Sequence, residues 1–86
     1  MIDEIRQFLL GSLTEMKYDT DDVDDDTPLG PAGVDLTSLA LAELAMRVED
    51  GFGVRFDEDE AQTVAVMTVG ELCQAVAQRV RAESAR

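Results

Sequence analysis

Residues 35–50 read DLTSLALAELAMRVED, and this stretch decides how the rest of the chain can be arranged. It follows a run of turn residues and opens on Thr37 and Ser38, after which apolar residues recur with the period of an α-helix. Thr37 is a good N-cap, because its hydroxyl can accept a hydrogen bond from a free backbone N–H of the first turn. The stretch therefore predicts a helix that begins at Ser38 and ends at about Asp50.

Two adjoining faces of this helix are apolar. The stripe that should face the core consists of Leu41, Leu44, Ala45 and Val48. The second face consists of Leu39, Ala42 and Met46, and its acidic rim of Glu43, Glu49 and Asp50. A helix that is apolar on two sides either is deeply buried or offers one side to a partner. Gly51 and Gly53 follow and should stop the helix.

The flanking segments predict two further main helices. The first runs from Met1 to about Met16, and its apolar stripe is Ile2, Ile5, Phe8, Leu9, Leu13 and Met16. Gly11 lies inside it, where a close helix crossing would explain a glycine. The last helix starts at Thr68, because Thr68 and Glu71 fit a capping box. Its stripe is Val69, Leu72, Cys73, Val76, Ala77 and Val80, and residues 81–86 are expected to form a frayed tail.

Two connections join these helices. The first, from Tyr18 to Leu36, is long and acidic, with Val23 and Leu29 as its anchors on the core. The second holds the run DEDEAQTVAV at 57–66, which predicts one short helix capped by Asp57. Together the elements predict an all-α fold in one domain over 1–86. It is a small four-helix bundle of three main helices and one short helix, with a long first loop.

The charge balance is strongly acidic. Nineteen Asp and Glu face seven Lys and Arg, which gives a net charge of −12. This balance argues against nucleic-acid binding, which needs a basic surface. It is compatible with partners that carry basic surfaces, and equally with acidity that serves solubility. No leader and no apolar run long enough to span a membrane is visible, so we expect a cytoplasmic protein without membrane contact.

Most catalytic and metal-binding chemistry is excluded by composition. The chain has no histidine, which removes Ser-His-Asp catalysis and most zinc sites. The single cysteine, Cys73, lies on an apolar stripe and is expected to be buried and inert. In the acidic run from Asp19 to Asp26, no register supplies both the Gly and the Glu of an EF-hand loop. We read that run as a solvated loop and assign no metal site. The alternative left open is loose binding of divalent cations by Asp21, Asp22, Asp24, Asp25 and Asp26.

Ser38 differs from the other two serines in its position. Ser12 lies within the first helix and Ser84 in the tail, whereas Ser38 begins a helix after a long loop. The N-terminus of a helix stabilises an attached anion such as a phosphate. Without a neighbouring base Ser38 is a poor nucleophile, but it is well placed for modification by another enzyme. On spacing alone, a serine that merely begins a helix is the commoner case.

Three segments resemble the acyl carrier protein family, which includes peptidyl carrier domains. Ser38-Leu39, then three residues, then Glu43-Leu44 is similar to the family pattern at the start of the second helix. RVEDGFGVRF at 47–56 resembles the segment that closes that helix, and TVGEL at 68–72 resembles the start of the last. One position departs from the pattern. Thr37 stands where the family usually has Asp, and the nearest preceding acid is Asp35, so the resemblance leaves open which transferase acts on Ser38.

The resemblance implies a carrier fold of the stand-alone type and a role. Ser38 would receive 4′-phosphopantetheine from coenzyme A, and the thiol of that arm would hold an acyl group as a thioester. The chain itself would not be an enzyme. It would be a monomer served by a phosphopantetheinyl transferase, an acyl- or aminoacyl-loading enzyme, and a downstream transferase or synthase with a basic docking surface. The partner-reading face would be Leu39, Ala42, Glu43, Met46, Glu49 and Asp50.

Three functional hypotheses follow. The first is an acyl carrier protein of polyketide or other natural-product biosynthesis, since the central helix differs from the usual fatty-acid type. The second is an aminoacyl or peptidyl carrier of a nonribosomal-peptide pathway, which the motif at Ser38 does not distinguish from the first. The third, from another class, is an acidic helical adaptor that binds a basic protein and is never modified.

Overall fold

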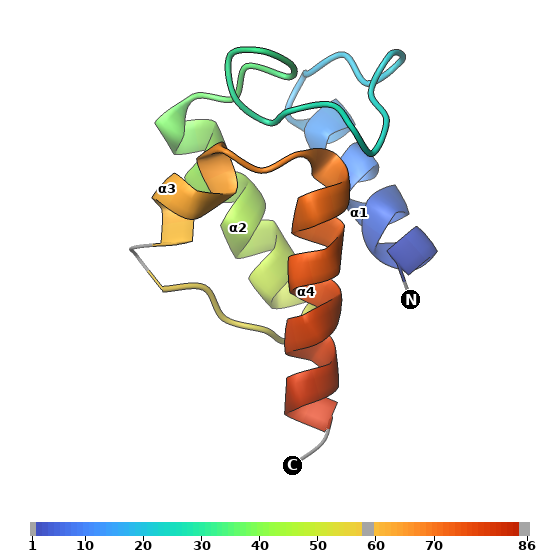
Figure 1. Cartoon of the computed structure of the whole chain (residues 1–86), viewed down its shortest axis with the longest axis vertical. Coiled ribbons are helices and arrows are strands. Elements are labelled where there is room, and N and C mark those ends of the chain that lie inside the picture. Colours follow the sequence, from blue (N-terminus) through green and yellow to red (C-terminus); the bar gives the residue numbers. More distant parts are fainter. Residues whose placement is uncertain (1, 58–59, 85–86) are drawn as a thin grey trace.

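The computed structural model describes residues 2–57 and 60–84, which form four helices. They are α1 (Ile2–Glu15), α2 (Ser38–Phe52), α3 (Glu60–Ala65) and α4 (Val69–Ser84). The long first loop crosses the end of the bundle at which α1 finishes and α2 and α4 begin (Figure 1). Within the described residues the one β-type pairing is an isolated bridge. The predicted all-α fold of three main helices and one short helix is confirmed.

The core is formed by the apolar stripes that the helical periodicity predicts. The buried residues of α1, α2 and α4 include Ile5, Leu9, Leu13, Leu41, Leu44, Val48, Val69, Leu72, Cys73, Val76 and Ala77. Ala45, predicted for the same stripe, is half-buried. Burial of such side chains is the main driving force for folding, so these three helices carry most of the stability of the fold.

The close approach of α1 and α2 depends on Gly51. The rings of Phe8 and Phe52 meet edge to face with centroids 5.0 Å apart. A Cβ on Gly51 would lie 2.6 Å from Cζ of Phe8, so no larger residue fits there without a shift. Gly11, which we expected at a helix crossing, has no atom within 4 Å of the place a Cβ would take. The glycine required for close packing is therefore on the other helix.

Helix α2 begins at the predicted residue, Ser38, but ends two residues later than predicted, at Phe52. The Thr37 hydroxyl accepts a hydrogen bond from the Ala40 N–H, as predicted for an N-cap. Gly51 lies within the helix instead of stopping it, and the helix continues to Phe52. Gly53 then adopts a left-handed conformation with φ 68°, which a glycine adopts without steric cost.

The long first loop is pinned to the helices at several points. Leu29 is buried and Val23 is half-buried, so both predicted anchors are confirmed. Arg6 of α1 donates two hydrogen bonds, of 2.6 and 2.7 Å, to the carboxylate of Asp25. This hydrogen bonding lowers the pKa of Asp25. The backbone carbonyl of Asp25 also accepts from the Gly70 N–H, at 2.8 Å.

The same loop is joined to the segment in front of α4 by a short bridge. The pairing is between Pro28 and Thr68. The Leu29 N–H donates to the Met67 carbonyl, and the Val69 N–H donates to the carbonyl of Thr27, both at 3.0 Å. The loop that leads into α2 is thus fixed by residues distant in sequence.

The last two helices show one confirmed cap and one corrected boundary. The Thr68 N–H donates to the Glu71 carboxylate at 2.9 Å, and the Glu71 N–H donates to the Thr68 hydroxyl at 3.2 Å, which is the predicted capping box. The prediction of a frayed tail over 81–86 is wrong for residues 81–84, because α4 continues through Ser84. Residues 85–86 lie outside the described part of the chain. None of the helices described is long and apolar enough to cross a membrane.

The predicted short helix within 57–66 is present as α3, from Glu60 to Ala65. At its start the Asp57 N–H donates to the Glu60 carboxylate at 2.8 Å. The Glu60 N–H in turn donates to the Asp57 carbonyl at 3.0 Å. The side chain that reaches back across this turn is therefore that of Glu60.

Candidate functional site

Ser38 is the first residue of α2, and it is exposed. The preceding residue, Thr37, has extended backbone angles (φ −72°, ψ 166°) and satisfies the Ala40 N–H at 3.0 Å. The first N–H groups of a helix have no partner within the helix, and they give its N-terminus a partial positive charge. A phosphate attached to the Ser38 hydroxyl would therefore lie where the helix dipole favours negative charge.

The segment just before Ser38 is anchored to the core and to the preceding loop. Leu36 is buried, and its N–H donates to the Leu29 carbonyl at 3.0 Å. Asp35, just before it, is exposed and adopts a left-handed conformation with φ 62°, which aspartate tolerates better than most residues. The Asp35 N–H donates to the Gly30 carbonyl at 2.8 Å. Ser38 is therefore exposed between two buried residues of the chain, Leu36 before it and Ala40 after it.

The second apolar face predicted for α2 is exposed. Leu39 is 81% exposed and Met46 is 62% exposed, which is unusual for large apolar side chains. Ala42, Glu43 and Asp50 are exposed as well. Glu49 differs from the other rim residues, because it is half-buried and its carboxylate accepts a hydrogen bond from the Phe56 N–H at 2.8 Å. Glu49, one residue of the predicted rim, thus holds the connection after α2 in place through a hydrogen bond.

A groove of about 230 Å³ lies between α2 and α3, next to this face. Its lining residues are Leu41, Ala42, Ala45, Met46, Glu49, Phe56, Asp57, Glu60 and Val64. Three of them, Ala42, Met46 and Glu49, also belong to the predicted partner face. The exposed face of α2 is therefore continuous with a largely apolar groove.

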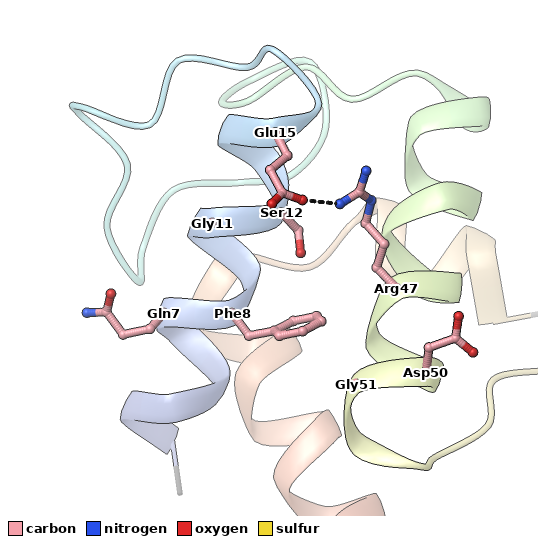
Figure 2. A pocket seen from close by; sticks show the side chains of 8 residues that line it. All are labelled: Gln7, Phe8, Gly11, Ser12, Glu15, Arg47, Asp50 and Gly51. Atoms are coloured by element: carbon pink, nitrogen blue, oxygen red, sulfur yellow. Dashed lines mark hydrogen bonds and ion pairs between the residues drawn. The ribbon is translucent and has the colours of Figure 1, made fainter.

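A second hollow, of about 460 Å³, lies between α1 and α2 (Figure 2). The Phe8 ring extends from α1 towards Gly51, and an ion pair of 2.5 Å joins Glu15 to Arg47 across the hollow. Of the predicted site residues it includes Asp50 alone. It lies towards the C-terminal end of α2, whereas Ser38 is at the N-terminal end, so the hollow is separate from the serine.

Neither a metal site nor a reactive thiol is found among the residues that the structure describes. In residues 2–57 and 60–84, no three His, Cys, Asp or Glu side chains are grouped so that they could hold a metal ion. Cys73 is fully buried, and that burial raises the pKa of its thiol. A thiol of raised pKa is protonated at neutral pH and is a poor nucleophile.

Fold and site together define a class of protein: a small acidic helical bundle that presents one serine at the head of its central helix. The sequence matches a protein family described as "Phosphopantetheine attachment site" over residues 9–76, which include all of α2 and α3. The chain belongs to this family. No curated protein matches the sequence.

Membership establishes the general role. Proteins of this family carry a covalently attached 4′-phosphopantetheine. They are carrier domains, in general not catalytic, and they interact with phosphopantetheinyl transferases and with partner enzymes. The resemblance noted in the sequence is therefore confirmed at the level of the family.

One structural residue was not identified by sequence reasoning. Arg79 of α4 reaches out to Arg55 in the connection between α2 and α3 and to Glu60 at the start of α3. Its partners come from another part of the chain, so no local spacing could reveal them.

Proposed function

We propose that the protein is an acyl carrier protein whose 4′-phosphopantetheine is attached to Ser38. The observation that supports this is the position of Ser38 as the exposed first residue of α2, with its backbone held on both sides. In the reaction, the Ser38 oxygen forms a bond to the β-phosphorus of coenzyme A, and the bond from that phosphorus to the nucleotide breaks. The transferase accepts the serine proton, since this chain offers no histidine.

The attached arm would carry an acyl group as a thioester on its thiol. A tethered substrate meets each partner enzyme at a high effective concentration, although the carrier forms and breaks no bond itself. We propose that the partners act in trans and belong to polyketide or other natural-product biosynthesis, because α2 differs from the usual fatty-acid type. Since the arm derives from coenzyme A, we place the protein in the cytoplasm.

The proposed partner-reading face is Leu39, Ala42, Glu43, Met46, Glu49 and Asp50. Its exposed apolar side chains, Leu39 and Met46, would supply contact area. The net charge of −12 would attract loading enzymes and synthases with basic docking surfaces. A basic partner is therefore favoured over a second copy of this chain, which would be repelled.

Intact mass after incubation with coenzyme A and a broad-specificity transferase tests the proposal. Wild type should gain one phosphopantetheine, and Ser38→Ala should gain none. Ser12→Ala is the matched control, because Ser12 is buried within α1, and this variant should be modified like wild type.

If folded wild type stays unmodified with two transferases of different type, the carrier role of Ser38 is wrong and the adaptor hypothesis gains. If wild type is modified at Ser38, the acyl group that copurifies with it from the native host distinguishes an acyl carrier from an aminoacyl or peptidyl carrier.

A further inference from the structure

Arg79 of α4 contacts three residues of the chain between α2 and the start of α3. Its Nη1 donates a hydrogen bond of 2.7 Å to the backbone carbonyl of Arg55. Its Nη2 pairs with the carboxylate of Glu60. Its guanidinium also lies over the Phe56 ring, with the central carbon 4.5 Å from the ring centroid. One planar side chain thus engages a carbonyl, a carboxylate and an aromatic face, which is a use that suits arginine and not lysine.

The same segment is held from the other side by α2. The Glu49 carboxylate accepts from the Phe56 N–H at 2.8 Å, so Phe56 is fixed by its backbone to α2 and by its ring to α4. The Glu60 carboxylate that pairs with Arg79 also accepts from the Asp57 N–H. These polar contacts form a chain of bonds from α2 through the connection to α4.

These contacts hold a short helix, α3, against the bundle. With six residues, α3 is far shorter than a helix that is stable alone. It packs against α2, and among its described side chains Val64 is buried. Between α3 and α2 lies the groove of about 230 Å³, whose walls include Phe56 and Glu60. Two residues of the Arg79 cluster are therefore also walls of the groove.

We propose that Arg79 is a positioning residue that clamps α3 and segment 54–57 onto the bundle, and that the clamp sets the width of the groove between α2 and α3. A single exposed ion pair contributes little to stability. Arg79 acts on three groups at once, and all three lie in segment 54–57 or at the start of α3, so its effect should be local. The inference concerns the conformation of α3 and stands whether or not Ser38 is modified.

Hydrogen exchange of the full chain, followed by mass spectrometry, tests the clamp. In Arg79→Ala, amides of segment 54–57 and α3 should exchange about tenfold faster, as expected when a few polar contacts of a local unit are lost. Exchange in α1 should not change. Nile red, a neutral apolar dye, should fluoresce more strongly with this variant because the groove is wider.

Arg81→Ala is the matched control, since Arg81 is an exposed arginine of the same helix, and this variant should behave as wild type. Arg79→Lys should be intermediate, because an ammonium can pair with Glu60 but cannot also stack on Phe56 in the same way. Should Arg79→Ala not fold, Arg79→Lys and Glu60→Gln carry the test by the same criterion.

Two results would overturn the clamp. The first is exchange in segment 54–57 and α3 that stays within about twofold of wild type. The second is an acceleration of equal size in α1, which would mean a general loss of stability and no local role for Arg79.

Discussion

The two sides of α2 are built in different ways. Towards α1, the contact is made by interlocking apolar groups, with the Phe8 ring against Phe52 and over Gly51. Towards α3, the contact leaves an apolar groove, and polar bonds from Glu49 and Arg79 hold the neighbouring segment. The same helix should therefore be sensitive to side-chain volume on one side and to charge on the other.

The difference follows from the length of the neighbouring helices. A helix of fourteen residues, such as α1, can bury a stripe of several apolar side chains, whereas six residues of α3 cannot. On the α3 side, polar contacts therefore add to the packing of a short helix, and an apolar groove stays open beside it. A helix that must show one face to other molecules can be supported in this way, with firm packing on the opposite side.

The largest effect on stability is expected at the buried core face of α2. Leu44 is 1% exposed, so Leu44→Ala should destabilise the fold by about 2–5 kcal/mol, which is a large part of the stability of a small domain. Leu39→Ala, on the exposed face of the same helix, should cost less than about 0.5 kcal/mol. Urea unfolding of both variants measures the two values. A cost below about 1 kcal/mol for Leu44→Ala would show that the assigned core face is wrong.

A smaller effect should separate two glycines that lie within helices, Gly11 in α1 and Gly51 in α2. Gly51→Ala should destabilise by about 1–3 kcal/mol, because the new methyl group would meet the Phe8 ring. Gly11→Ala should stabilise by about 0.5–1 kcal/mol, since alanine favours helix and the site is open. Urea unfolding again gives both numbers. If both variants shift the free energy of unfolding in the same direction, steric conflict with the Phe8 ring does not decide which residue fits at position 51.

The smallest effect is expected from charge on the α3 side. The hydrogen bond from Arg79 lowers the pKa of Glu60 below its ordinary value of 4.5. A carboxylate whose pKa is lowered by folding stabilises the folded state at pH values above its ordinary pKa. This stabilisation is lost as the pH falls through the folded-state pKa. The pair is partly exposed, so the contribution should be below about 1 kcal/mol.

Thermal unfolding of wild type and Glu60→Gln between pH 7 and pH 3 would measure this charge effect. The wild-type advantage should be constant near neutral pH and should shrink below pH 4.5, as Glu60 becomes protonated. Comparison with the glutamine variant removes the general effect of pH on the other carboxylates. An advantage that persists unchanged at the lowest pH would mean that Glu60 contributes through packing and not through charge.

The features that could be predicted from the sequence depend on neighbouring residues. The Thr37 cap, the Thr68 and Glu71 capping box and the core stripes all follow from spacing within one helix. The end of α4 was missed because the apolar pattern stops at Val80, while the next residues, alanine and glutamate among them, are good helix formers.

The features that could not be predicted depend on contacts between distant segments. The close approach is at Gly51 because Phe8 of α1 lies against it, whereas no residue of α2 lies against Gly11. Glu49 was read as part of an exposed rim, but its partner is a backbone N–H seven positions away on the following connection. The position of Ser38 followed from local pattern, and its attachment role remains a prediction for the mass experiment.

The bridge between Pro28 and Thr68 also bears on the order of synthesis. Residues 27–29 precede α2, yet their partners at 67–69 leave the ribosome only after α2 and α3 have been made. A nascent chain that stops within α3 would contain Ser38 but would lack the bonds that order the loop in front of it. Contacts between distant segments close late in folding, because the loop between them must first lose its conformational freedom. The approach to Ser38 is therefore completed only after translation has reached the start of α4.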